Sequence, residues 1–261
     1  MATMLFYEKA VALNREAHQN FTLKVQPDHF AFAKKTNSAL VTAGEFAQAA
    51  LDYPVVFVGQ AGGPFTAVAL LGLAADENLM VTAAGIWEPD TYIPAFVRRY
   101  PFVLAGDEKQ DTLTVCLDEA YAGWNSEQGT RLFEADGSDS TYLKNMVGFL
   151  QQFHSEMNQT NALAARLAEL GLLASKVITL EVDGQKSNLE GIWVVDEKKL
   201  MALGDAQMLE LARTGALGLV HAHLLSLHSI GRLVRRQTAR RQAAAEALAE
   251  QLPESGTGVV H

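Results

Sequence analysis

The segment 87–102 concentrates the residue types that could bind a ligand. It reads Trp-Glu-Pro-Asp-Thr-Tyr-Ile-Pro-Ala-Phe-Val-Arg-Arg-Tyr-Pro-Phe, a dense mixture of aromatic rings, prolines and two adjacent arginines. Pro94 suits the first turn of a short helix and Pro101 ends it. On such a helix Arg98 and Arg99 point about 100° apart, so one guanidinium can pair internally while the other faces a cleft. The segment therefore indicates a ligand site, although the same rings could instead cover a sheet.

We expect other parts of the chain to complete this site. The candidate ligand-binding residues are Trp87, Tyr92, Arg98, Arg99, Tyr100, His18 and Glu45. No residue is predicted to be catalytic, and neither a cofactor nor a metal is expected. The alternative is an enzyme of unknown reaction, whose site forms around 92–102 with Cys116 as a further member.

A nucleophilic set is the most specific catalytic alternative. Cys116 and Asp118 are two residues apart on a predicted strand and would share a face, where His18 or His29 could approach them. Free cysteine is among the most buried residue types, so we interpret Cys116 as a core thiol. The sequence has no GxSxG, HExxH or phosphate-loop motif.

Three histidines near the C-terminal end could suggest a metal site. On a helix His221 and His223 lie about 200° apart, while His221 and His228 are two turns apart and too distant to chelate one ion. We interpret them as hydrogen-bonded residues of a packed helix. A pH-sensitive interface is the alternative, because imidazole titrates near neutrality.

Composition limits the class of protein. The chain has 261 residues, of which 49% are hydrophobic and 20% charged, so it can fold around a substantial core. Its formal charge of −9 argues against nucleic acid as a partner. A single cysteine excludes an intramolecular disulfide and a cysteine-based zinc cluster. Neither a signal peptide nor an apolar run of about 20 residues is evident, so we expect a cytoplasmic protein without a membrane span.

Positive charge is concentrated in one short stretch. Residues 232–241 contain five arginines and no acidic residue. They are Arg232, Arg235, Arg236, Arg240 and Arg241. We interpret them as a solvated helix face or as partners of the acidic body of the protein. A contact surface for nucleic acid or an anionic membrane is the alternative, although the stretch has no aromatic residue to stack on bases. The apolar C-terminal helix is also compatible with a homo-oligomer.

The first 135 residues are predicted to form a largely antiparallel sheet with packed helices. Thr42 and Glu45 form a capping-box pattern that starts a helix at about 43–52, and Val55–Val58 is typical of a central strand. The other predicted strands are Phe21–Val25, His29–Phe32, Phe65–Leu73, Asn78–Ile86, Phe102–Leu104 and Thr112–Leu117.

The chain from 138 onward is predicted to be mainly helical. One helix begins at Ser138, a second at Thr160, and Gly171 is placed to cap its end. A hairpin of Val177–Val182 and Leu189–Val195 encloses Asp183-Gly184 in a loose loop. Short helices follow Asp196 and Asp205, and the longest helix runs from Thr214 to about Leu248. We therefore expect a single α+β domain over 1–251, with a sheet-rich part (about 1–135), a helix-rich part (about 138–251) and a flexible tail at 252–261.

Several segments resemble the bacterial SapC family over nearly the whole chain. They are Tyr92–Phe102, Tyr53–Phe57, Leu70–Gly72, Cys116–Asp118, Gly191–Trp193 and Ala222–Leu227. The family takes its name from an association with bacterial surface layers, and it is confused with a peptide-transporter permease. Members are often encoded beside outer-membrane receptors and flavin-dependent tryptophan-halogenase-like proteins. The resemblance thus implies a soluble accessory or binding protein without transport activity, associated with a surface layer or with a protein or peptide partner. A flavin-dependent, halogenase-like enzyme is one such partner.

Overall fold

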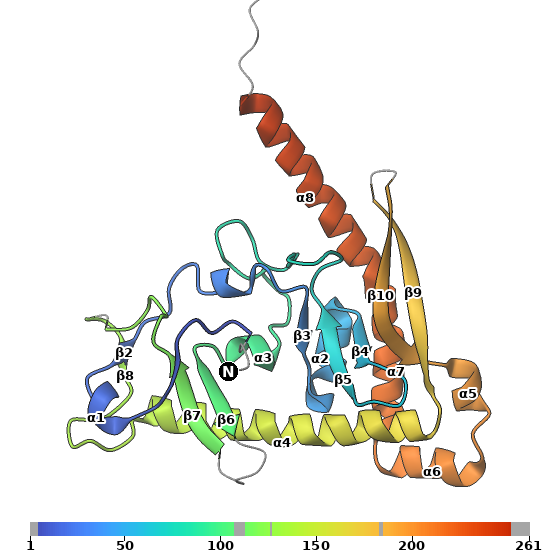
Figure 1. Cartoon of the computed structure of the whole chain (residues 1–261), viewed down its shortest axis with the longest axis horizontal. Coiled ribbons are helices and arrows are strands. Elements are labelled where there is room, and N and C mark those ends of the chain that lie inside the picture. Colours follow the sequence, from blue (N-terminus) through green and yellow to red (C-terminus); the bar gives the residue numbers. More distant parts are fainter. Residues whose placement is uncertain (1–4, 107–112, 126, 183–184, 252–261) are drawn as a thin grey trace, which may run out of the picture.

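Two antiparallel sheets lie along one long helix in this computed structural model, which describes residues 5–106, 113–125, 127–182 and 185–251 (Figure 1). The five-stranded sheet has the order β3 (Ser38–Leu40), β5 (Phe65–Leu70), β4 (Val55–Gly59), β10 (Gln185–Val195), β9 (Leu173–Val182). The three-stranded sheet has the order β1 (Ala10–Ala12), β7 (Leu113–Asp118), β6 (Phe102–Gly106), and β2 (Thr22–Leu23) pairs with β8 (Thr130–Arg131). The α+β fold with antiparallel sheets is confirmed.

The five-stranded sheet contains strands from both parts of the chain. Its middle strand is β4, as the continuous apolar run predicts, and Phe57 of β4 pairs with Trp193 of β10. Strands β9 and β10 therefore extend a sheet that begins with N-terminal residues. The hairpin strands are longer than predicted, and Asp183-Gly184 lies outside the described residues.

Helix α4 (Thr141–Glu169) connects the two hydrophobic clusters. Leu143 and Leu150 belong to the cluster around the three-stranded sheet, whereas Phe153, Met157 and Leu167 belong to the cluster around the five-stranded sheet. The buried positions recur every three or four residues, which places them on one helix face. Each fully buried leucine contributes about 1.5–3 kcal/mol from removal of apolar surface from water.

The remaining helices surround this framework. They are α1 (Arg15–His18), α2 (Phe46–Asp52), α3 (Ala95–Arg98), α5 (Glu197–Met201), α6 (Asp205–Arg213), α7 (Ala216–Ser226) and α8 (Ile230–Gln251), with 3-10 turns at Ala31–Ala33, Ala43–Glu45 and Leu227–Ser229. The predicted helix at 43–52 corresponds to the second 3-10 turn together with α2. The short helices after Asp196 and Asp205 are confirmed as α5 and α6.

A buried histidine fixes α7 to the sheet. The Nδ1 atom of His223 donates to the Val55 carbonyl at 2.7 Å, and its Nε2 accepts the Val195 N–H at 3.0 Å. Burial lowers the pKa of His223 to about 4, so the ring is neutral at pH 7. His223 is thus a hydrogen-bonded core residue, as the sequence predicts, because its ring joins β4 to β10.

Two predicted strands are wrong. His29–Phe32 lies in turns followed by the 3-10 turn at Ala31–Ala33, in which Phe32 stacks on Tyr100. The segment Asn78–Ile86 is irregular, because the Asn78 side chain bonds to the Ala33 carbonyl and the Met80 N–H in place of a strand partner. In both segments alternating apolar residues fill the core without a β-ladder.

Two predicted helix boundaries are also wrong. Thr160 lies inside α4, because its hydroxyl donates to the Glu156 carbonyl one turn earlier and starts no new helix. The helix predicted from Thr214 to Leu248 is divided into α7 and α8 by the 3-10 turn at Leu227–Ser229. The 29 residues of α4 also exceed the 22 of α8. The predicted cap at Gly171 is confirmed by its positive φ of 67°.

The arginine-rich helix α8 contacts the body of the protein along one face and then extends away from it (Figure 1). Arg232 lies 3.8 Å from Asp52, and Arg236 forms an ion pair with Glu88 at 3.0 Å. Arg240 donates two 2.8 Å hydrogen bonds, to the carbonyls of residues 78 and 81. Arg232 and Arg236 therefore contact acids of the body, in agreement with one of the two interpretations from the sequence, whereas Arg240, one turn further, contacts backbone carbonyls.

Candidate functional site

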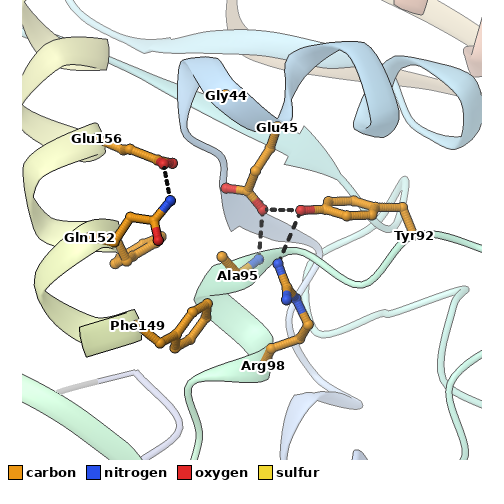
Figure 2. A pocket seen from close by; sticks show the side chains of 9 residues that line it. Gly44, Glu45, Tyr92, Ala95, Arg98, Phe149, Gln152 and Glu156 are labelled. Carbon is orange, nitrogen blue, oxygen red and sulfur yellow. Dashed lines mark hydrogen bonds between the residues drawn. The ribbon is translucent and has the colours of Figure 1, made fainter. Parts of the chain in front are cut away.

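A cavity of about 290 Å³ lies between α3 and α4. We call it the α3–α4 cavity (Figure 2). Its size is near the lower limit for small-molecule sites. The residues that line it are Gly44, Glu45, Tyr92, Ala95, Arg98, Phe149, Gln152, Phe153 and Glu156.

Glu45 connects three segments at the cavity wall. Its Oε2 accepts the Thr42 N–H at 2.8 Å, as the capping box predicts. Its Oε1 accepts the Ala95 N–H at 2.6 Å and the Tyr92 hydroxyl at 2.8 Å. The side chain is buried, and these three donors stabilise its charge. Glu45 therefore holds the start of α3 against the start of α2.

Tyr92 is positioned through both its backbone and its ring. Its N–H donates to the Asp52 carboxylate at 2.9 Å, and its carbonyl accepts the Tyr53 hydroxyl. Trp87 donates from Nε1 to that Tyr53 hydroxyl at 3.3 Å. Burial and the adjacent Glu45 carboxylate raise the pKa of Tyr92 to about 12. The Tyr92 hydroxyl is therefore a neutral hydrogen-bond donor at pH 7.

Arg98 directs an exposed guanidinium toward the cavity. Its Nε donates to the Ile93 carbonyl at 2.9 Å and its Nη2 donates to the Tyr92 hydroxyl at 3.2 Å. The guanidinium carbon lies 5.3 Å from the ring centroid of Phe149 and 5.7 Å from that of Tyr92. Within the described ranges Arg98 has no carboxylate partner, and its Nη1 makes no hydrogen bond. One donor group of a fixed cation is thus free for a ligand.

The opposite wall belongs to α4 and carries a second carboxylate. Glu156 accepts the Thr42 hydroxyl at 2.8 Å on Oε2 and the Gln152 amide at 2.9 Å on Oε1. A Cβ at Gly44 would lie 3.3 Å from Oε2, so glycine allows this backbone to approach the carboxylate closely. No cationic side chain among the described residues pairs with Glu156.

The two adjacent arginines have different environments. Arg99 is directed inward, with its guanidinium carbon 4.3 Å from the Phe96 ring centroid and 5.3 Å from that of Phe153. Burial lowers the pKa of Arg99, and the nearby Tyr7 side chain raises it in part. Arg99 has no carboxylate partner among the described residues, and its buried Nε makes no hydrogen bond. Arg98 therefore faces a cavity and Arg99 is internal, as the helical angle predicts. Arg99 packs on aromatic rings, however, and does not form the internal pair that was expected.

Three of the seven candidate residues line the cavity, namely Glu45, Tyr92 and Arg98. Trp87 contacts the site indirectly through Tyr53. Tyr100 lies outside the cavity lining, where it stacks on Phe32 with ring centroids 4.0 Å apart and donates to Asp118.

His18 also lies outside the cavity lining. It is buried on α1, at the end of the molecule beside β2 and β8 (Figure 1), with Nε2 3.3 Å from a Glu119 carboxylate oxygen. Its ring also packs edge-on against Phe21. His18 is therefore part of a separate polar contact at the surface of the three-stranded sheet.

The nucleophilic alternative is not assembled among the described residues. Cys116 is buried, its Sγ contacts the Thr114 carbonyl at 3.9 Å, and burial raises the pKa of its thiol. Asp118 accepts backbone N–H groups of residues 8 and 9, and His29 lies 3.2 Å from the Tyr121 hydroxyl. Cys116 is therefore a core thiol, as interpreted from the sequence.

The four α4 residues that line the cavity were not among the candidates predicted from the sequence. Phe149, Gln152, Phe153 and Glu156 follow i, i+3, i+4 and i+7 spacing, so one side of α4 carries all four. That periodicity is visible in the sequence, but it does not show which other element faces the helix. Among the described residues no group of three or more His, Cys, Asp or Glu side chains could hold a metal ion.

The comparison with known families agrees with these sequence patterns. The SapC family model matches residues 13–233, and the chain belongs to the SapC family. No curated protein and no solved structure matches the chain. Among the described residues, no helix is long and apolar enough to cross a membrane.

Proposed function

We propose that this SapC-family chain is a binding protein, without transport activity of its own, and that its ligand presents a carboxylate to Arg98 in the α3–α4 cavity. The observation that carries the proposal is the free Nη1 of a guanidinium whose Nε and Nη2 atoms each donate one hydrogen bond within the protein. Arginine suits this role because its planar donors match the geometry of a carboxylate.

Groups of the protein itself orient the Arg98 side chain. The Ile93 carbonyl and the Tyr92 hydroxyl each accept one of its hydrogen bonds, and the Phe149 ring lies beside the guanidinium. Tyr92 is in turn held by the buried Glu45 carboxylate. A side chain that is already ordered loses less conformational entropy on binding, which supports recognition by this residue.

Binding is favoured over catalysis by the state of the polar groups. Glu45 already accepts three hydrogen bonds, and the raised pKa of Tyr92 keeps its proton in place near neutral pH. The nine described residues that line the cavity include no cysteine, histidine, serine or lysine. An enzyme at this position would have to use Glu156 as its base.

We propose further that the ligand-bound chain acts in the cytoplasm as an accessory to another protein. The small cavity suits a small molecule or the end of a peptide better than a folded domain. Flavin-dependent enzymes of the halogenase-like class are the first partners to test, and co-purification with such an enzyme would show the association.

Titration with 3-phenylpropionate tests the ligand site, because this probe carries one carboxylate on an apolar frame. We expect Arg98→Gln to weaken binding by at least about tenfold, since a charge-assisted hydrogen bond contributes about 1.5–3 kcal/mol. Arg98→Lys should retain part of the affinity. Arg213→Gln removes an exposed arginine on α6 outside the cavity, and this control should bind like the wild type.

Two outcomes would contradict the proposal. Equal binding by the wild type and Arg98→Gln would place the carboxylate elsewhere. Equal binding of the neutral amide, 3-phenylpropionamide, would show that charge is not recognised. Chemical turnover of the probe, followed by mass spectrometry, would favour the enzyme alternative.

A further inference from the structure

The carboxylate of Glu156 faces the same cavity as Arg98, and it has no cationic partner. We propose that the ligand of the α3–α4 cavity is a zwitterion, a short peptide whose N-terminal ammonium group binds Glu156 while its C-terminal carboxylate binds Arg98. This inference rests on the proposed function, because it adds a second recognition point to the same site.

Glu156 has acceptor capacity left for an ammonium group. Each of its two oxygens accepts one hydrogen bond from a neutral donor, Thr42 or Gln152. An ionised carboxylate offers about four acceptor positions. The residue is only partly exposed, and removing an unpaired charge from water is costly. A ligand ammonium would supply the missing opposite charge.

The other acid of the cavity is not available in this way. Glu45 is buried, and its oxygens already accept two backbone N–H groups and the Tyr92 hydroxyl. Three of its roughly four acceptor positions are therefore used within the protein. The charged groups of the cavity that keep the most free hydrogen-bonding capacity are Arg98 on one wall and Glu156 on the other (Figure 2).

The two charges are separated along α4 by an apolar surface. The Arg98 guanidinium lies beside Phe149, and Glu156 follows seven residues later, which is about 10 Å along a helix axis. Phe153 lies between these positions and also lines the cavity. A ligand that contacts both charges must cross this aromatic surface, so its frame should be apolar between or beside its charged groups.

Four probes separate the contributions of the charged groups. 3-Phenylpropionate has the carboxylate alone, phenethylamine has the ammonium alone, and L-phenylalanine has both on the same frame. L-alanyl-L-phenylalanine has both with a longer separation. We expect L-alanyl-L-phenylalanine to bind the wild type at least tenfold more tightly than 3-phenylpropionate, as measured by isothermal titration calorimetry. L-phenylalanine, whose two charged groups share one carbon, is too short to reach both Arg98 and Glu156 and should lack this preference.

Glu156→Gln should remove this tenfold preference and leave the affinity for 3-phenylpropionate within about threefold. Glutamine keeps an acceptor for the Thr42 hydroxyl, so the variant should retain the wild-type circular dichroism spectrum. The matched control is Glu169→Gln on the same helix, which removes an exposed acid outside the cavity and should keep the preference. Glu156→Asp provides a second variant that keeps the charge.

The results distinguish the two proposals. If L-alanyl-L-phenylalanine binds no better than 3-phenylpropionate, or if Glu156→Gln keeps the full preference, the zwitterion inference is wrong while carboxylate binding at Arg98 stands. If Arg98→Gln has no effect on 3-phenylpropionate, the proposed function itself is wrong. Loss of the preference in Glu156→Gln, with retention in both Glu169→Gln and Glu156→Asp, supports the inference.

Discussion

The Glu45 carboxylate accepts a 2.8 Å hydrogen bond from the hydroxyl of Tyr92, a residue 47 positions later in the chain. The same oxygen accepts the Ala95 N–H at the start of α3. A single buried carboxylate thus fixes both the ring that supports Arg98 and the helix that carries Arg98. The geometry of the site depends on a residue that also starts a helix.

Glu45→Gln should therefore lower both stability and ligand affinity. The glutamine amide would place N–H groups against some of the three donors that the carboxylate now accepts, and an unsatisfied buried donor costs about 1–3 kcal/mol. Urea unfolding followed by circular dichroism measures the change. Glu16→Gln, at an exposed position on α1, is the control and should change stability by less than about 0.5 kcal/mol. Equal stability of Glu45→Gln and the control would show that the carboxylate is not required.

Gly44→Ala should affect ligand binding more than stability. The new Cβ would lie 3.3 Å from the Glu156 Oε2, so this flexible carboxylate must shift. Alanine also restricts the unfolded chain, so we expect a net stability change within about 1 kcal/mol. Affinity for L-alanyl-L-phenylalanine should fall several-fold by calorimetry. Gly148→Ala is the control on α4, since nothing lies within 4 Å of its added Cβ; an unchanged affinity in Gly44→Ala would contradict the role of this close approach.

The stability of the protein should depend on pH through His223. Burial lowers its pKa to about 4 in the folded chain, whereas the unfolded value is about 6.5. Between these values the unfolded chain binds a proton that the folded chain does not. This contribution is therefore complete above pH 6.5 and decreases by about 1.4 kcal/mol per pH unit as the pH falls toward 4.

Denaturant unfolding from pH 4.5 to 7 measures this slope. His223→Gln should be less stable overall but should lack this part of the pH dependence. His221→Gln, at an exposed position on the same helix, should keep the wild-type slope. Parallel curves for the wild type and His223→Gln would assign the pH dependence to other groups.

Arg240→Ala should loosen the contact between α8 and the irregular segment at 78–86. Arg240 donates to the carbonyls of Asn78 and Val81, which are both buried residues. Losing these donors should cost about 1–2 kcal/mol and increase amide hydrogen exchange in both segments, as measured by mass spectrometry. Arg241→Ala is the control at an exposed neighbouring position. Equal exchange in the two variants would mean that the Arg240 contact does not hold α8 in place.

We propose that residues 1–251 form one folding unit, because β10 pairs with β4 in the sheet shared by both parts of the chain. The full chain should unfold in a single transition by near- and far-ultraviolet circular dichroism. A fragment of residues 1–137 lacks α4, β9 and β10 and should show no cooperative unfolding. A cooperative transition in that fragment would instead indicate two domains.

Local sequence signals predicted several elements correctly. The capping box at Thr42 and Glu45 starts a helix as expected, and the apolar run at Val55–Val58 forms the middle strand. The prediction for Asn78–Ile86 was wrong because the backbone there bonds to the Asn78 side chain and to Arg240, which is distant in sequence. Alternating hydrophobicity alone does not distinguish such a segment from a strand.

The candidate site was predicted in part for the same reason. The helical angle between Arg98 and Arg99 predicted their different environments, because it depends only on neighbouring residues. Glu156 could not be identified, since its position in the cavity results from packing of α4 against segments more than a hundred residues earlier, including Thr42. Tyr100 was expected at the site because it adjoins Arg99, but its ring packs on Phe32.

Because α4 is long, it extends from the cavity to both sheets. A helix of 29 residues measures about 43 Å, and α4 packs against β5 in one sheet and β6 in the other. Phe149 and Glu156 lie near its middle, so the helix that lines the cavity is also the one that packs against both sheets.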